Sequence, residues 1–343
     1  MRRRKRLFRL TATLFLVVLA GGLFAVYAWR QLETPYQGFR EDAAFLEVER
    51  GMSSARIAER LEEKGVIAHA WQFRLLRLLR PRAVLQAGEY RFTKPASVRA
   101  VFGRLARGDV YYVTLAIPEG ANLFEIAALV AAADLPNAGD FLKHAKNPSL
   151  IRDLAPSAPS LEGYLFPSTY QFRRKATSAE ICERLTGEFR KQWKALGAPE
   201  NTQRLVTLAS LVEKETSIAE ERPVVASVYW NRLRAGMRLD CDPTVIYAAL
   251  LEGKYRGTIY RSDLERDSPY NTYRRTGLPP GPIANPGAAA LRAAIHPAET
   301  SYLFFVAKGD GSGAHRVSED LAGHSVNVNH YRKAVNEHGA GTK

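Results

Sequence analysis

The feature that most constrains this chain is a run of twenty residues without a charged side chain, from Leu10 to Trp29. About 20 apolar residues span the hydrocarbon core of a bilayer. Five arginines and one lysine lie before the run, and segments rich in such residues stay in the cytoplasm. The pattern predicts a transmembrane helix over 10–29 behind a cytoplasmic basic tail over 1–9. The rest of the chain is then expected on the outer, periplasmic side of the inner membrane.

A cleavable signal peptide is the alternative to this anchor. The apolar region of such a peptide usually has about 7–15 residues and ends in a small-x-small site. The segment 25–28 is a poor version of that site, whereas Tyr27 and Trp29 lie where an interfacial aromatic belt belongs. We therefore expect an uncleaved single-pass anchor. ATP-dependent and cytosolic chemistry do not fit such a topology, and the polymer just outside a bacterial membrane is the cell wall.

The chain is long enough for two or three folded units, since domains usually hold roughly 100–200 residues. It has 343 residues, 46% of them hydrophobic, and a formal net charge of +14. Such a charge suits nucleic acid, anionic lipid or an acidic polymer as partner. No basic patch with interleaved aromatics is visible, so we expect no nucleic-acid partner. Cys182 and Cys241 are too few for a disulfide framework, although a bridge between them stays open.

The pattern after the anchor predicts an α+β protein. A polar tether over 30–43 leads into a small α+β subdomain over 44–113, with strands at Phe45–Val48 and Gly88–Phe92. A larger, mainly helical domain with a small sheet is expected over 114–335, and 336–343 form a tail.

Within the larger domain, helical periodicity alternates with breaks. A linker-like stretch contains Pro156, Pro159 and Pro167, and a Gly- and Pro-rich loop is expected over Asn271–Gly287. Tyr302–Val306 predicts a strand. The expected helices are Leu123–Ala132, Ile181–Trp193, Gln203–Thr216, Pro223–Gly236 and a segment that Asp242 caps and Pro243 begins.

Two carboxylates, Glu213 and Glu215, lie near the end of an otherwise apolar helical run that starts at Leu205. At 100° per residue, Glu215 falls roughly 70° from the centre of the apolar stripe and Glu213 roughly 90° away on the other flank. Burial raises the pKa of a carboxyl group, and a raised pKa is what a general acid needs near neutral pH. An amphipathic helix whose last turn simply reaches solvent fits the same periodicity.

Several motifs accompany this helix in a fixed order. They are Leu161–Pro167, Val212–Thr216, Asn231–Leu233, Gly236–Leu239, Asp242–Tyr247, Tyr270–Tyr273, Gly277–Ile283, Asn285–Gly287 and His296–Pro297. Together they resemble the endolytic murein transglycosylase family, also called MltG or YceG-like, and the resemblance extends from the anchor to about Tyr331.

The resemblance implies a lytic transglycosylase that cleaves the MurNAc-β-1,4-GlcNAc bond of nascent peptidoglycan with 1,6-anhydro-MurNAc formation. Such an enzyme ends glycan elongation beside the membrane-bound synthases. The resemblance also implies that Glu215 is the catalytic acid and that 44–113 is a LysM-like, glycan-contacting subdomain. The family usually has Gln and a small residue before Asp-Pro-Thr, where this chain has Asp240 and Cys241. This departure bears on the charge near the site.

Other residues are candidates for lesser roles. Asn231 faces inward on its helix, where its amide suits a hydrogen bond to an N-acetyl group, to Glu215 or to backbone at the helix end. Aromatic rings stack on sugars and polar side chains bind hydroxyls, so a sugar groove is expected from Glu162, Tyr164, Asn271 and Tyr273.

Three charged residues have structural or competing roles in this hypothesis. Glu213 competes with Glu215 for the acid role or contacts substrate, Arg222 is expected to pair with an acid, and Asp242 is the expected helix cap. The histidines show no metal-ligand spacing, so we expect neither metal nor cofactor.

Two alternative functions stay open. A non-catalytic peptidoglycan-binding membrane scaffold would use the subdomain over 44–113 and leave the acidic helix structural. A hydrolytic muramidase would need water and a second carboxylate, for which Asp240 and Asp242 are the candidates.

Overall fold

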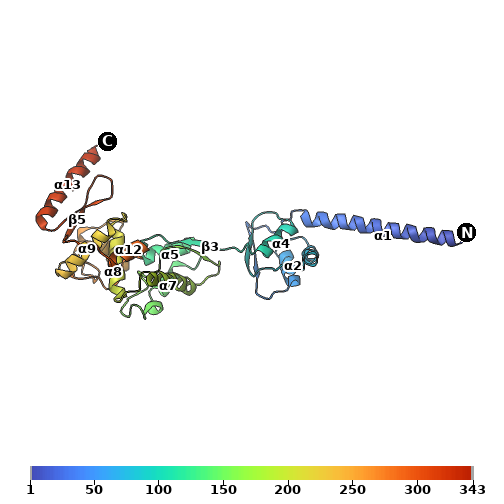
Figure 1. The fold of residues 1–343 in the computed structure, drawn as a ribbon, viewed down its shortest axis with the longest axis horizontal. Helices are drawn as coiled ribbons and strands as arrows, with labels where there is room; N and C mark the ends of the chain where they lie inside the picture. Colours follow the sequence, from blue (N-terminus) through green and yellow to red (C-terminus); the bar gives the residue numbers. More distant parts are fainter. Residues whose placement is uncertain (1, 341–343) are drawn as a thin grey trace. The chain divides into compact units, whose positions relative to one another are not determined.

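The computed structural model describes residues 2–340, with side chains over 11–337, and the chain divides into two units. The first unit ends at Tyr112 and the second begins at Val113. Each unit encloses its own hydrophobic core. Figure 1 shows α1 at the N-terminal end of the first unit and the helices α8, α9 and α12 together in the second.

The N-terminal helix α1, Arg2–Glu33, is long and apolar enough from Thr11 onward to cross a membrane. Its large apolar side chains, such as Leu14, Phe15 and Val18, are exposed, because no part of the described chain covers them. The helix continues four residues into the expected tether. The basic tail over 1–9 belongs to this helix from residue 2, and its side chains lie outside the described part.

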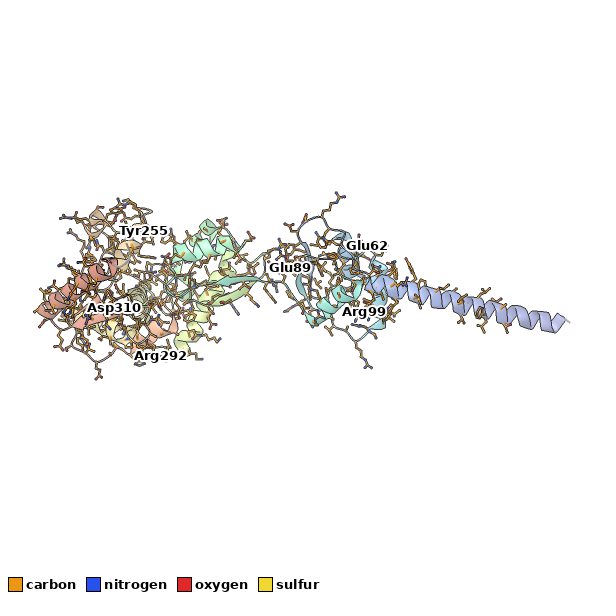
Figure 2. The ribbon with its side chains drawn as sticks, turned by 90° about the horizontal axis from the view of Figure 1, so that it is seen from above. Glu62, Glu89, Arg99, Tyr255, Arg292 and Asp310 are labelled. Carbon is orange, nitrogen blue, oxygen red and sulfur yellow. The ribbon has the colours of Figure 1, made fainter. Side chains whose placement is uncertain are left out.

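The C-terminal end of α1 packs on the first unit. Leu32 is buried, and the Arg99 guanidinium lies 4.5 Å from the centre of the Trp29 ring and pairs with Glu33. Figure 2 labels Arg99 beside this end of the helix. Tyr36 then forms a backbone bridge with Ala96. The segment expected as a polar tether is therefore partly fixed on the protein.

The first unit follows the predicted order of strands and helices. It contains β1 (Ala44–Val48), α2 (Ser54–Glu63), α3 (Ala70–Leu79), β2 (Gly88–Phe92) and α4 (Val98–Arg107). β1 and β2 are antiparallel, with Leu46 opposite Tyr90. Ser53 and Ser97 cap α2 and α4 by accepting hydrogen bonds from backbone N–H groups of the first turn.

The second unit is mainly helical with small antiparallel sheets, so the α+β class is confirmed. β3 pairs with β4, and β5 pairs with β6. Helix α8 packs on both α9 and α12, and its acidic end is half-buried at Glu213 and Glu215. The elements are β3 (Val113–Ala116), α5 (Leu123–Ala132), α6 (Ala138–Ala145), the 3-10 helix η1 (Pro148–Ile151), β4 (Thr169–Phe172), α7 (Ser178–Ala195), α8 (Thr202–Glu215), α9 (Arg222–Arg234), α10 (Asp242–Leu251), α11 (Arg261–Leu264), α12 (Ala288–Ile295), β5 (Phe304–Ala307), β6 (His315–Ser318) and α13 (Leu321–Ala340).

The prediction of a linker-like stretch around Pro156–Pro167 is wrong. Leu161, Tyr164 and Leu165 are fully buried in the core of the second unit, and the Tyr164 ring packs edge-on against Phe189 at 5.1 Å. The prolines remove helical periodicity, but the segment between them is apolar enough to be buried. A break in periodicity therefore marked an irregular core segment.

Two boundaries also differ from the sequence prediction. Cys241, and not Asp242, occupies the cap position of α10, so Asp242 lies in the first turn. The expected tail over 336–343 is helical as far as residue 340, where α13 ends.

Gly163 fixes this buried segment, and replacing it by alanine is expected to destabilise the protein by about 2–4 kcal/mol. Its φ is +87°, and a Cβ would lie 2.4 Å from Cγ of Pro282 and 2.9 Å from Cγ1 of Val206. Gly253→Ala is the matched control, because φ is +66° there and nothing lies within 4 Å of the added Cβ. It should cost only the backbone strain, about 1 kcal/mol. Urea unfolding of both variants checks the prediction, and equal losses would contradict it.

Candidate active site

Glu215 is the last residue of α8 and lies against a buried hydroxyl. Tyr229, in α9, donates its phenolic hydrogen to Oε1 of Glu215 at 2.8 Å. The Tyr229 side chain is fully buried, and its ring packs edge-on against Phe305 of β5. A second donor is the thiol of Cys241, which is also buried. Both donors are uncharged, so neither forces Glu215 to ionise.

Burial is the main influence on Glu215 and raises its pKa above the ordinary range. The hydrogen bonds from Cys241 and Tyr229 oppose this rise, the negative charge of Asp242 adds to it, and protonated His315 opposes it. The raised pKa keeps more of the carboxyl protonated near neutral pH. A carboxyl that stays protonated near neutral pH is what a general acid requires.

Glu213 lies in a different environment from Glu215. Its carboxylate accepts a hydrogen bond from Arg222 at 2.9 Å and another from the backbone N–H of Gly287 at 2.8 Å. Glu119 lies 3.7 Å from the same guanidinium. Burial raises the pKa of Glu213, and the Gly287 N–H and the Arg222 charge oppose that rise. Arg222 thus pairs with an acid, as the sequence analysis expected, and its charge opposes protonation of Glu213, whereas no guanidinium pairs with Glu215 in the described chain.

The two acids diverge because they lie on different sides of α8. Residues two positions apart on a helix point about 200° apart. Glu213 therefore reaches Arg222 and the start of α12, whereas Glu215 reaches Tyr229 and the start of α10.

Asp242 and Tyr273 complete the side of the site nearest α10. The Tyr273 hydroxyl donates to Asp242 at 2.6 Å, and the Asp242 charge acts on Glu215. Asp240 points elsewhere, since its carboxylate lies 3.5 Å from Arg232 and 3.9 Å from Arg238. Of the two candidates for a second carboxylate, Asp242 is therefore the one near Glu215. Cys182 and Cys241 are both free thiols in the described chain.

Three predicted groove residues are instead enclosed in the core. Glu162 accepts hydrogen bonds from the N–H of Leu123 at 2.9 Å and from Nδ2 of Asn285 at 2.7 Å. Asn271 donates to backbone carbonyls of residues 264 and 266. Their exposed fractions, like that of Tyr164, are 1% or less. Groups so enclosed hold the backbone in place, and they do not present a surface to a sugar.

Asn231 lies on the face of α9 opposite Tyr229, since the two are two residues apart. Its Nδ2 donates to the carbonyls of Thr300 and Tyr302, each at 2.8 Å, and its Oδ1 accepts from Arg234. These contacts correspond to the backbone-satisfying role.

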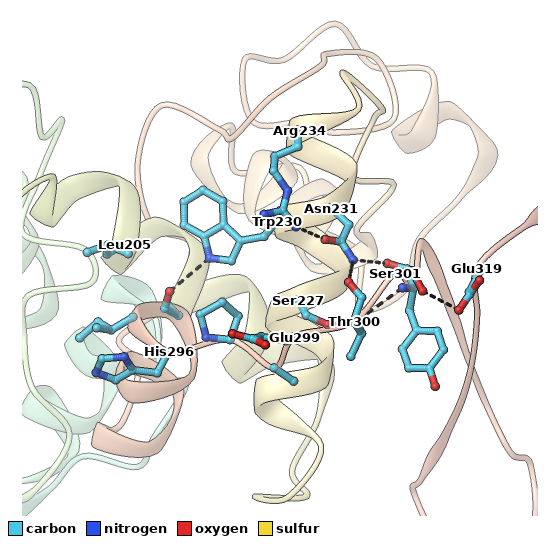
Figure 3. Close-up of a pocket in the computed structure, with 15 residues that line it drawn as sticks. Leu205, Ser227, Trp230, Asn231, Arg234, His296, Glu299, Thr300, Ser301 and Glu319 are labelled. Atoms are coloured by element: carbon cyan, nitrogen blue, oxygen red, sulfur yellow. Dashed lines mark hydrogen bonds between the residues drawn. The ribbon is translucent and has the colours of Figure 1, made fainter.

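Asn231 also lines a pocket of about 1100 Å³, shown in Figure 3 with Trp230, His296 and Glu299. Glu215 does not line this pocket.

A smaller pocket of about 480 Å³ is lined by residues adjacent in sequence to Glu215 and Asp242, although Glu215 itself does not line it. Lys214, which precedes Glu215, and Pro243, which follows Asp242, both line it. Phe124, Tyr247 and the exposed Tyr255 supply aromatic rings, and Figure 2 labels Tyr255.

Sequence reasoning missed Tyr229, the thiol contact of Cys241 and the approach of His315. Tyr229 lies 14 residues after Glu215, and His315 lies 100 residues after it. No local pattern connects residues so far apart, because their meeting depends on how α9, α10 and β6 pack around α8.

The fold and site define an α+β protein with an N-terminal apolar helix and a half-buried acid at a helix end. The YceG-like family model matches residues 46–330, and the chain belongs to this family. It is 34% identical over 315 residues to an endolytic murein transglycosylase of Bacillus subtilis, with 86% of each protein covered. It is 29% identical over 337 residues to an endolytic murein transglycosylase of Streptococcus pneumoniae, covering 88% of this chain and 61% of that protein.

A solved structure supports the same grouping. A yceG-like protein of Listeria monocytogenes superposes with a TM-score of 0.53 at 30% identity. The match covers 83% of this chain and 99% of the Listeria chain.

The buried Glu162 generates a pH-dependence of stability. Burial raises its pKa from 4.5 to about 8. The folded protein therefore binds a proton there that the unfolded chain releases above about pH 4.5. Stability should fall as the pH rises from about 4.5 to about 8, by up to about 1.4 kcal/mol per pH unit, and level off above that.

This prediction is checked by urea unfolding of the wild type and Glu162→Gln across pH 4–9. The free-energy difference between them should change in favour of the variant as the pH rises through that window. A difference independent of pH would show that Glu162 is ionised in the folded protein.

Proposed function

We propose that this protein is an endolytic lytic transglycosylase of peptidoglycan and that Glu215 is its catalytic acid. The observation that carries the proposal is the setting of Glu215, which is half-buried and, within the described chain, accepts hydrogen bonds from the uncharged side chains of Tyr229 and Cys241. Family membership and the printed activity of the relatives supply the substrate class. The acid assignment also agrees with the ion pair that occupies Glu213.

The proposed reaction needs one carboxyl group for two proton transfers. Glu215 first donates its proton to the glycosidic oxygen as the bond from C1 of MurNAc to O4 of GlcNAc breaks. The resulting carboxylate then accepts the proton of the C6 hydroxyl of MurNAc as O6 bonds to C1. This closes the 1,6-anhydro ring and returns the proton to Glu215. Because the nucleophile belongs to the reacting sugar, little entropy is lost in bringing it to C1.

The neighbouring groups fit both states of the acid. While Glu215 is protonated, burial and the Asp242 charge stabilise the neutral form. Once it is a carboxylate, the hydrogen bonds from Tyr229 and Cys241 stabilise the anion. The pocket beside Lys214 and Pro243 is our candidate for holding an adjacent sugar, since aromatic rings line it. Tyr273 stays a candidate for contacting substrate through its position at Asp242.

The test is the mass of fragments released from purified sacculi by the protein in detergent. Ring closure without water gives anhydro-ended fragments, whereas a muramidase that uses Asp242 as second carboxylate gives fragments heavier by one water. A non-catalytic scaffold pellets with the sacculi and releases nothing. We expect anhydro-ended fragments only.

Glu215→Gln should remove this activity, lowering the rate by about 10²–10⁴-fold or more, because no group replaces the proton donor. Glu213→Gln is the matched control, since it changes the other acid of the same motif and should keep anhydro product formation in whatever fraction stays folded. Thermal unfolding verifies the folded fraction of each. Wild-type yields from Glu215→Gln would remove Glu215 from the mechanism.

We further propose that α1 anchors the protein in the inner membrane with its N-terminus in the cytoplasm. The exposed apolar side chains of α1 and the basic residues before them support this orientation. The folded parts of the chain after α1 then lie on the periplasmic side, beside the peptidoglycan synthases. The first unit, a separate core with its own β1–β2 pair, is the proposed LysM-like glycan-contacting subdomain.

The orientation predicts that protease added to spheroplasts degrades the part of the chain after residue 33 and spares an epitope tag placed at the N-terminus. Loss of the tag with an intact remainder would reverse the topology.

A further inference from the structure

His315, the first residue of β6, is held by an acid that precedes α9. Glu221 accepts two hydrogen bonds from it, one from the backbone N–H at 2.8 Å and one involving Nδ1 at 2.8 Å. A carboxylate this close accepts a hydrogen from Nδ1 in the neutral and in the charged ring, so the ring is fixed in orientation. Burial disfavours the charge on Glu221, but the bonds from His315 lower its pKa overall, so it is ionised at neutral pH.

Two chains of contacts lead from this pair to Glu215. In the polar chain, Glu221 also accepts a hydrogen bond at 3.3 Å from Thr216, the residue that follows Glu215. In the aromatic chain, the His315 ring lies edge-on to Phe305 with centroids 5.5 Å apart. Phe305 in turn lies 5.8 Å from the ring of Tyr229, the hydrogen-bond donor to Glu215.

The β5–β6 hairpin therefore packs directly on Tyr229 through Phe305, and it is linked to the end of α8 through Glu221 and the Thr216 hydroxyl. The hairpin also has a second face, because successive strand residues point to opposite sides of a sheet. Phe304 stacks on His324 of α13 at 5.0 Å on that other side.

We infer that His315, oriented by Glu221, is a positioning residue that stabilises the carboxylate form of Glu215 in the second half of the reaction. The inference rests on the proposed function, in which Glu215 becomes an anion once the C1–O4 bond has broken. O4 keeps the bond electrons and the proton of Glu215, and O6 later bonds to C1 and gives its proton back. His315 gains and loses no proton in this sequence, and acts only through its charge and contacts.

The charged and titratable groups around the pair come from several elements. Glu215 lies on α8, Tyr229 on α9, Cys241 and Asp242 at α10, and Glu221 before α9. Of the groups that act most strongly on Glu215 in the described chain, His315 is the one that can carry a positive charge, and that charge opposes the rise in the pKa of Glu215 that burial causes. Its loss should therefore raise that pKa further.

The test is His315→Asn, measured as kcat and KM for release of anhydro-ended fragments between pH 5 and pH 9. The Asn amide keeps a donor near the position of Nδ1 but carries no charge. We expect kcat to fall about tenfold, the effect of about one pKa unit of differential interaction. KM should stay within about twofold, because the residue does not bind substrate. The basic limb of kcat/KM, where Glu215 ionises, should move to higher pH.

His324→Asn is the matched control, since it removes a histidine from the other face of the same hairpin. It should leave kcat and the basic limb unchanged. His315→Gln places the amide nearer the position of Nε2 and gives a second neutral variant if His315→Asn unfolds. Its kcat and basic limb should change in the same way.

Two outcomes separate this inference from the proposed function. Folded His315 variants with the wild-type pH profile and kcat would overturn the inference alone, leaving the pair as a structural link between hairpin and helix. Absence of fragments from the wild type would overturn the proposed function, and the inference with it.

Discussion

The hydrogen bond from Tyr229 to Glu215 is the interaction on which the site depends. It joins the end of α8 to the middle of α9 and satisfies one oxygen of a half-buried carboxyl whose pKa burial raises. An unpaired buried carboxylate would be costly, and a guanidinium partner would hold the group ionised. A phenol does neither, because it bonds to the neutral and to the charged form. Glu213, two residues earlier, shows the opposite solution in its pairing with Arg222. Environment, and not residue type, separates the roles of the two acids.

The sequence was sufficient to locate the acidic helix and most regular elements of the fold. Periodicity placed α8 within one residue at each end, because an apolar stripe packed on α9 and α12 produces a clear pattern. Periodicity also showed that the two glutamates lie on different flanks. It did not show which flank meets Arg222 and which meets Tyr229, since that depends on the packing of α9. The motif resemblance pointed to Glu215 as the acid, which stays a proposal, and the structure shows that Glu215 is the one that meets Tyr229.

The buried motif residues show why the predicted groove was less successful. Motif residues and groove residues are both polar or aromatic, so residue type does not separate them. Asn271 anchors a loop by binding three backbone carbonyls, and Thr272 next to it accepts the N–H of Cys241 at 3.0 Å. That loop holds the thiol against Glu215. These residues therefore support the site indirectly, because they fix the backbone next to Cys241, a hydrogen-bond donor to Glu215.

The chain departs from the usual family pattern at Asp240 and Cys241, and the surroundings of these two residues show how this affects the charge near Glu215. An added carboxylate at the acid would raise the pKa of Glu215 and disfavour its anion during turnover. The backbone avoids this: Asp240 has a φ of +48°, and its carboxylate lies near Arg232 and Arg238. Cys241 occupies the position where the family usually has a small residue, and a thiol is a weak donor that fits there. Asp242 thus remains the near anion, held by the Tyr273 hydroxyl. Two nearby groups then act in opposite directions on the pKa of Glu215, the Asp242 charge raising it and the His315 charge lowering it, and this is why we propose a role for a histidine 100 residues away in sequence.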